Sequence, residues 1–117
     1  MREVFKANWA FQLFFKLAKT RAITLNKTAY YRDDRTTVNK NLYLRLHECF
    51  HAIEQREQGH RFYIGYFLDI FKAWKHREDE LQAIAFGTEY VKLYTKEHLD
   101  KTPTEYVQWV YDNVKIG

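Results

Sequence analysis

The sequence LYLRLHECFHAIEQREQ, residues 42–58, determines how the rest of the chain is interpreted. Its apolar residues recur at intervals of three and four, which is the spacing of one helical face. Within it, His47 and His51 stand four positions apart, and Glu48 follows the first histidine directly. Residues four apart are separated by about 40° around a helix axis, so both imidazoles project from the same side. The segment therefore predicts an amphipathic helix with a chemical cluster on one side.

The spacing His47-Glu48-Cys49-Phe50-His51 is typical of a zinc site. Neutral imidazole is a preferred zinc ligand, with a Zn–N distance of about 2.0–2.1 Å. Glu48 lies about 100° around the helix from His47, too far to join the ligands but near enough to hold a water molecule and take its proton. His47 and His51 are therefore predicted metal ligands, and Glu48 is the predicted general base. Cys49 points away from this side, and we interpret it as a small buried hydrophobic residue.

A catalytic zinc ion takes a third protein ligand and keeps one position open for water. The favoured candidate is Glu80, in the sequence Glu80-Leu-Gln-Ala83 near the start of a helix expected over 78–96. A small residue at position 83 would let this helix approach the histidine-bearing helix closely. Glu78 and His76 are the alternative ligands. For each of the three, an exposed residue at the start of a helix is the structural alternative, because acids are favoured in a first turn.

The segments around this helix predict a small, predominantly helical α+β fold in a single domain, residues 1–117, with four to five helices. β-branched and aromatic residues over 22–25 and 28–31, on either side of Asn26-Lys27, indicate a short hairpin. The polar stretch 33–40 is expected to form a turn, with Asn39 as the N-cap of the helix over 42–58. Further helices are expected over 3–19, over 61–74 after a stop at Gly59, and over 103–113 with Thr102 as N-cap and Pro103 as first residue.

The composition is that of a soluble domain with a substantial core, since 46% of the 117 residues are hydrophobic and 29% are charged. The net charge of +4 comes from Lys and Arg scattered among acids, and no nucleic-acid motif accompanies it, so a nucleic-acid partner is not expected. Serine is absent, which excludes a serine nucleophile, and the single cysteine excludes an intrachain disulfide.

The longest apolar stretch, residues 4–18, is interrupted by polar residues and is shorter than the about 20 residues of a membrane span. It also lacks a clean signal-peptide cleavage site, so a cytoplasmic location is expected. Ordinary core packing is the favoured interpretation of its aromatic residues. The alternative is a peripheral membrane contact through Trp9, Phe11, Phe14 and Phe15.

Several of these stretches occur together between Ala22 and Phe86: Ala22-Ile-Thr-Leu25, a Tyr-rich strand, Leu46-His-Glu-x-x-His51, Gly59, an aromatic helix, and Glu80-x-x-Ala83. In this combination the chain resembles a family of small, poorly characterised zinc metallopeptidases of the zincin type. The resemblance implies a minimal zincin-like domain in which His47, His51 and Glu80 bind Zn²⁺ and Glu48 is the base. That family commonly has Gln three positions after the second histidine, where this chain has Glu54. Glu54 lies on the histidine face, where it would orient an imidazole; a plain exposed acid is the alternative.

The function predicted from these residues is hydrolysis of a peptide or protein substrate by a zinc metallopeptidase. The alternative is a catalytically inactive, metal-binding interaction module with the same fold. An oxyanion donor would come from His60, Tyr63, His76 or Tyr90, although a structural role is favoured for each. The strand containing Tyr30 and Tyr31 is expected to offer its edge to an extended peptide.

Overall fold

The structure is a computed structural model that describes residues 1–58 and 73–116, with side chains in the second range described from residue 78 onward. This part of the chain contains five helices and three strands, in the order β1 (Arg2–Val4), α1 (Trp9–Ala18), β2 (Ala22–Leu25), β3 (Thr28–Tyr31), α2 (Arg35–Asn39), α3 (Leu42–Gln58), α5 (Ala73–Glu97) and α6 (Pro103–Asn113). The predicted α+β, predominantly helical fold class is confirmed. The expected stop at Gly59 and nearly all of the helix expected over 61–74 lie outside the described residues.

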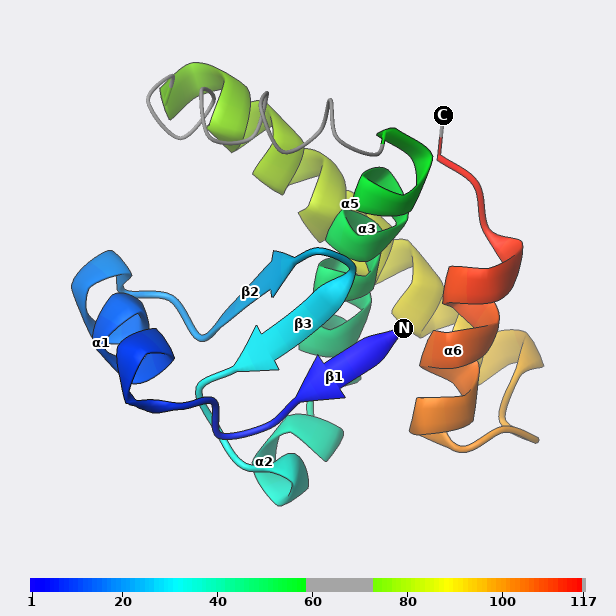
Figure 1. Ribbon diagram of the computed structural model, residues 1–117. Coiled ribbons are helices and arrows are strands. Elements are labelled where there is room, and N and C mark those ends of the chain that lie inside the picture. Colours follow the sequence, from blue (N-terminus) through cyan, green and yellow to red (C-terminus); the bar gives the residue numbers. More distant parts are fainter. Residues whose placement is uncertain (59–72, 117) are drawn as a thin grey trace.

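The three strands form one mixed sheet with the order β1-β3-β2 (Figure 1). The predicted hairpin is confirmed: β2 and β3 pair antiparallel, with Ala22 opposite Tyr31 and Leu25 opposite Thr28. Its two-residue turn has positive φ at both Asn26 and Lys27, as a type I′ turn requires. β3 is the central strand of this sheet, so the expectation that Tyr30 and Tyr31 offer a free edge is wrong. Among the described strands, the edges belong to β1 and β2.

The N-terminal helix is shorter than the predicted 3–19. Arg2–Val4 instead forms β1, which pairs parallel with β3. α1 begins only at Trp9, where the Asn8 side chain accepts a hydrogen bond from the Phe11 backbone N–H. Strand pairing prevails here because it places the Glu3 carboxylate against the buried Arg45 guanidinium, 2.6 Å away.

The polar stretch before α3 contains the short helix α2 in place of the expected turn. Asp34 caps this helix by accepting a hydrogen bond from the Thr37 backbone N–H, and the buried Val38 anchors it to the core. Asn39 as the cap of α3 is also wrong, because Asn39 is the last residue of α2. Asn41 takes that role, accepting a hydrogen bond from the Leu44 backbone N–H at 3.0 Å.

α3 lies at the centre of the molecule, between the sheet and the helices α5 and α6 (Figure 1). Its apolar side packs into a core that includes Phe86 of α5 and three residues of α6. Cys49 is fully buried in this core, and burial raises the pKa of its thiol to about 12, so its interpretation as a small hydrophobic residue is confirmed. The last helix is confirmed with its predicted cap, Thr102, which forms a capping box with Glu105.

Small residues bring α5 close to α3. Ala83 is completely buried against α3, as its position after Glu80 predicts. One turn further on, a Cβ atom added at Gly87 would lie 3.0 Å from the ring of Tyr43. This close approach carries the beginning of α5, including Glu80, across the histidine side of α3.

Candidate metal centre

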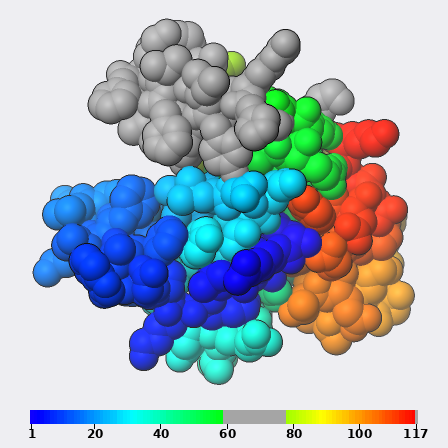
Figure 2. Space-filling view, in the orientation of Figure 1, coloured from blue at the N-terminus to red at the C-terminus, as the bar shows by residue number. Residues whose placement is uncertain are grey.

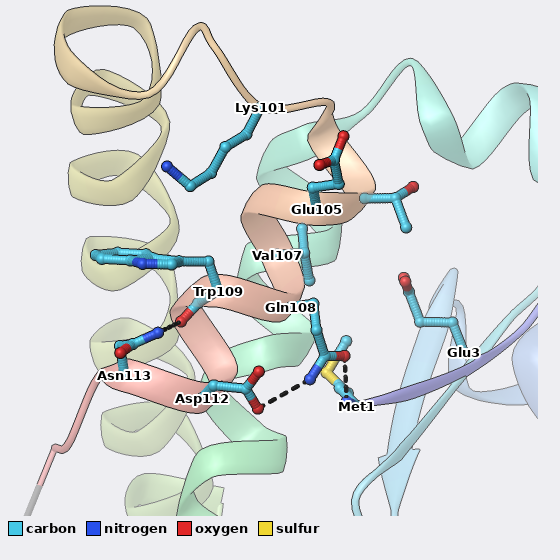
Figure 3. A pocket seen from close by; sticks show the side chains of 10 residues that line it. Met1, Glu3, Lys101, Glu105, Val107, Gln108, Trp109, Asp112 and Asn113 are labelled. Carbon is cyan, nitrogen blue, oxygen red and sulfur yellow. Dashed lines mark hydrogen bonds between the residues drawn. The ribbon is translucent and has the colours of Figure 1, made fainter.

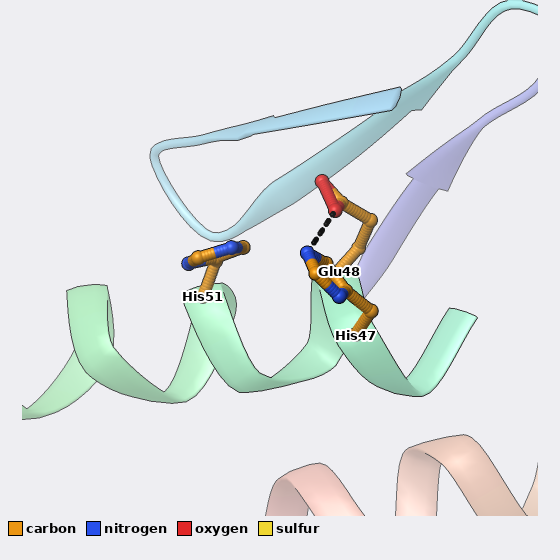
Figure 4. Close-up of side chains that lie close together, drawn as sticks. All are labelled: His47, Glu48 and His51. Atoms are coloured by element: carbon orange, nitrogen blue, oxygen red, sulfur yellow. Dashed lines mark ion pairs between the residues drawn. The ribbon is translucent and has the colours of Figure 1, made fainter. Parts of the chain in front are cut away.

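The two histidines of α3 lie on the same side of the helix, as predicted. Figure 4 shows both rings rising from α3 toward the strands, with the Glu48 side chain beside them. The ring centroids of His47 and His51 are 5.2 Å apart. His51 is buried, and only 12% of the His47 side chain is exposed. The helix therefore holds the two imidazoles side by side and largely shielded from solvent.

Glu80 of α5 joins both rings. One oxygen of its carboxylate lies 2.8 Å from His51 Nε2, and the other lies 3.0 Å from His47 Nε2. Of the two candidate third ligands whose side chains are described, Glu78 and Glu80, Glu80 is the one that contacts the histidines. Glu78 is exposed on the same helix, and the side chain of His76 lies outside the described residues.

Glu48 is buried on the strand side of the histidines, with 4% of its surface exposed. The Thr24 hydroxyl of β2 lies within hydrogen-bonding distance of Glu48 Oε1, at 3.1 Å. The other oxygen, Oε2, lies 3.9 Å from His47 Nε2. Burial raises the pKa of Glu48, and the neighbouring imidazoles only partly offset this effect. A carboxylate with a raised pKa, fixed by one oxygen and open at the other, is suited to accept and return a proton.

The other ring nitrogen of His51 faces two more carboxylates. His51 Nδ1 is 3.0 Å from Glu54 Oε1 and 3.6 Å from Asp79 Oδ2. Glu54 is 6% exposed, so its interpretation as a plain exposed acid is wrong and its contact with an imidazole is confirmed. When Nδ1 donates to a carboxylate, the Nε2 lone pair of the neutral ring points away from it, toward Glu80, in the tautomer that a metal ligand needs.

These six residues, His47, Glu48, His51, Glu54, Asp79 and Glu80, form the histidine cluster, which contains more acids than bases. Burial tends to raise the pKa of Glu80, but its hydrogen bonds to His47 and His51 outweigh this and hold the pKa well below the usual range. Burial and the hydrogen bond to Glu54 raise the pKa of Asp79 to about 7. The cluster thus stabilises added positive charge. Ligand atoms of His47, Glu48 and His51, one from each residue, lie within 4.8 Å of one another, and Glu80 contacts both histidines. Imidazole nitrogens together with carboxylate oxygens are a zinc-type donor set.

The histidine cluster opens into a groove of about 560 Å³. β2 and the end of α1 form one wall, and α3 and α5 form the other. The residues along it range from basic to apolar and include Phe14, Lys19, Arg21, Ile23, Tyr43 and Ile84.

Three residues of this site were missed by the sequence analysis. Thr24 and Asp79 reach the cluster from β2 and α5, so only the tertiary structure brings them there. Tyr43 lines the groove with its ring centroid 6.0 Å from that of His47. Its position four residues before His47, on the same helical side, was a signal that could have identified it.

The proposed oxyanion donors gain no support from the described residues. His60 and Tyr63 lie outside them, as does the side chain of His76. Tyr90 packs its ring on Phe86, with centroids 4.4 Å apart, in the core beside α6. The structural interpretation of Tyr90 is therefore the better one.

A second pocket, of about 530 Å³, lies between the start of β1 and α6 (Figure 3). Its polar groups pair with one another. The amino group of Met1 donates to Gln108, whose amide in turn donates to Asp112 at 2.9 Å. Glu3 at its edge is engaged by Arg45. This pocket contains none of the predicted site residues.

Comparison of the chain with family models, with curated proteins and with solved structures finds no match in any of the three. The resemblance to small zinc metallopeptidases thus stays a prediction from the sequence. No helix in the described part of the chain is long and apolar enough to cross a membrane.

Proposed function

We propose that this chain is a zinc-dependent metallopeptidase, in which His47, His51 and Glu80 bind the ion and Glu48 is the general base. The observation that carries the proposal is the convergence of both Nε2 atoms on one carboxylate, at 3.0 and 2.8 Å. His51 and Glu80 are 29 positions apart in the sequence, yet side chains of the two helices meet at this carboxylate. Two histidines and one glutamate are a ligand set found at catalytic zinc sites.

A bound zinc ion would polarise the carbonyl of the scissile peptide bond and lower the pKa of a water molecule. The residues of the chain supply the remaining functions. Glu48 accepts the proton of the attacking water through Oε2 and returns it to the leaving amine, while Thr24 fixes the orientation of the carboxylate through Oε1. Glu54 and Asp79 hold the ring of His51 so that Nε2 faces Glu80, the position from which it would bind the ion.

The shape of the site supports a peptide as substrate. The groove passes along β2, an edge strand among the described strands, whose backbone groups can pair with an extended chain. Apolar side chains on both walls, Phe14 on α1 and Ile84 on α5, can contact substrate side chains on either side of the metal centre.

Metal analysis of the purified protein tests the metal-binding half of the proposal. After zinc loading and removal of free metal, the wild type should retain one ion per chain, and Glu80→Gln and His47→Ala should retain much less. Glu89→Gln is the matched control, because Glu89 is an exposed acid on the same helix as Glu80. Equal zinc content in all four proteins would contradict the proposed ligands.

Hydrolysis of a library of unstructured peptides tests the catalytic half. Glu48→Gln should retain zinc but lose hydrolysis by a factor of about 10² or more, the range expected for loss of a general base. Glu57→Gln, a change in the last turn of the same helix, should retain both properties. A wild type that binds zinc and cleaves nothing in the library would favour the alternative function, an inactive metal-binding interaction module.

A further inference from the structure

The outer side of α1 leaves a stripe of large apolar residues without cover in the described structure. Trp9, Leu13 and Leu17 recur every four residues and are 79%, 50% and 75% exposed, and the adjacent Phe14 is 40% exposed. The opposite side of the helix is packed: Phe15 is 1% exposed. Core packing therefore accounts for only part of this aromatic helix, and its exposed stripe needs another explanation.

The charge along α1 and the hairpin after it is mostly basic, although Arg21 and Arg32 pair with Asp33. Residues 4–32 contain six Lys and Arg and no Asp or Glu, although the whole chain contains 15 acids. All six of these basic residues are exposed. Lys16 lies on the same side of α1 as Trp9, two turns further along the helix. Lys6 precedes the helix, and Lys19 is its C-cap. An apolar stripe flanked by cations is complementary to a partner that has an apolar interior and anionic groups at its surface.

We propose that α1 binds the surface of an anionic lipid membrane, lying parallel to it with the stripe Trp9, Leu13 and Leu17 inserted at the boundary of the acyl chains. Trp is favoured at this boundary because its ring is apolar and its N–H is polar. Lys6, Lys16 and Lys19 then face lipid phosphates. A second copy of the chain fits less well, because docking stripe on stripe would bring the two sets of lysines together.

The position of α1 allows this contact. The helix lies at one end of the molecule, beyond β2 and away from α6, so a flat surface can reach it (Figures 1 and 2). α1 also supplies Phe14, Ala18 and Lys19 to the groove of the histidine cluster. Membrane binding would therefore hold this groove at the lipid surface, whatever reaction takes place there.

Sedimentation of the full chain with lipid vesicles, in the presence of EDTA, tests the proposal independently of any metal. The wild type should bind phosphatidylcholine vesicles that contain phosphatidylserine and should bind pure phosphatidylcholine weakly. Added salt should release it, because screening shortens the range of the lysine contacts. The emission of Trp9, obtained as the difference between the wild type and Trp9→Phe, should shift to shorter wavelength on binding.

Matched variants distinguish binding through the stripe from nonspecific binding of the chain to vesicles. Leu17→Gln should lower the partition coefficient by about tenfold, whereas Leu99→Gln, at a leucine that is 68% exposed outside the stripe, should not change it. Lys16→Gln should lower it by about fivefold, and Lys92→Gln, at an exposed lysine of α5, by much less.

Two outcomes would overturn the proposal. Equal partitioning of the wild type and Leu17→Gln into anionic vesicles would show that the stripe is not the contact. Absence of binding to all vesicles, together with a dimer in solution that Leu17→Gln dissociates, would assign the stripe to a second copy of the chain. Thermal unfolding of each variant verifies that these exposed substitutions leave the fold intact.

Discussion

Two buried polar clusters lie next to each other along α3, and they differ in how their charges are balanced. The first, the arginine cluster, consists of Arg45, Glu3, Tyr31, Asn39 and Thr104. The Arg45 guanidinium, 1% exposed, contacts both oxygens of Glu3 at 2.6 and 3.0 Å. Its remaining donors reach Asn39 and Thr104, and the Tyr31 hydroxyl donates to Glu3. One cation meets one anion, and the surrounding groups are polar partners.

The histidine cluster, by contrast, combines two imidazoles with four carboxyl groups. Even with both imidazoles protonated, the acids outnumber the bases, and the pKa values of Glu48 and Asp79 are raised as a result of burial and of their acidic neighbours. A cluster with balanced charges needs no further ligand, whereas a cluster with an excess of acids needs protons or a cation. The arginine cluster should therefore contribute to folding stability whether or not zinc is present. The contribution of the histidine cluster should depend on the protons or the cation that it binds.

Of the changes considered, disruption of the arginine cluster should lower the folding free energy the most. Arg45→Met leaves the carboxylate of Glu3 largely buried without its cation, and removing one partner of a buried ion pair typically costs about 3–5 kcal/mol of folding free energy. Urea unfolding measures this cost, and added zinc should not change it.

Two further variants sharpen this result. Arg2→Met, at an exposed residue next to Glu3, should cost less than about 0.5 kcal/mol. The double variant Arg45→Met with Glu3→Leu should regain much of the lost stability, because no unpaired charge is left buried. A loss below about 1 kcal/mol for Arg45→Met alone would show that the cluster is not a structural ion pair.

Adding zinc should have the next largest effect, and only through the histidine cluster. An ion that binds the folded chain alone, present at 100 times its dissociation constant, stabilises it by about 2.7 kcal/mol. The melting temperature should rise with zinc and return to its starting value with EDTA. His47→Ala should remove the response and Arg2→Met should keep it. A similar zinc response in both variants would place the binding elsewhere.

A change of pH should alter folding stability by a smaller amount. Stability should fall with rising pH in the metal-free chain, whereas the stabilisation by zinc should increase. Burial tends to lower the pKa of His51, but its hydrogen bonds to Glu54 and Glu80 and the charges of Glu48 and Glu80 outweigh this and raise the pKa well above the usual value. A raised pKa in the folded state stabilises the metal-free chain fully below the unfolded pKa of about 6.5. This stabilisation is lost as the pH rises through the raised pKa, by at most about 1.4 kcal/mol per pH unit for one proton.

Zinc must displace the proton on His51 Nε2, so the stabilisation by zinc should increase between pH 6 and pH 8. Unfolding in urea, with EDTA or with zinc, measures both slopes. His51→Gln should flatten the slope in EDTA and abolish the difference that zinc makes. An unchanged slope in this variant would mean that another group is responsible.

The sequence predicted the elements whose signals are local. The helix α3 follows from apolar periodicity, the hairpin from β-branched residues around Asn26-Lys27, and α6 from Thr102-Pro103. The strand β1 could not be predicted, because three residues form it only through pairing with β3 and the ion pair between Glu3 and Arg45. The prediction chose the wrong cap for α3 because Asn39 and Asn41 have the same side chain and lie two positions apart. Asn39 is the last residue of α2, so Asn41 is left to cap α3.

The residues of the candidate site also divide into those that a local sequence signal predicts and those that only tertiary packing brings together. His47, Glu48 and His51 follow from spacing within one helix, and Glu80 from the small residue three positions later that lets its helix approach. Thr24 and Asp79 carry no such signal, since a buried threonine in a strand and an acid in a helix are common. Their contacts depend on how β2 and α5 pack on α3, which the sequence does not specify locally. The bound ion and the reaction stay predictions.

The smallest change in stability is expected at Cys49, which lies between Glu48 and His51 in the sequence but points into the apolar core. Cys49→Ala removes one buried sulfur atom and should cost about 1 kcal/mol, with no change in zinc content or in the pH slope. In the folded wild type the thiol should not react with a thiol reagent at pH 8, because it is fully buried and its pKa is raised to about 12. Rapid labelling without denaturant, or loss of zinc from Cys49→Ala, would mean that the apolar side of α3 is not separate from the histidine cluster.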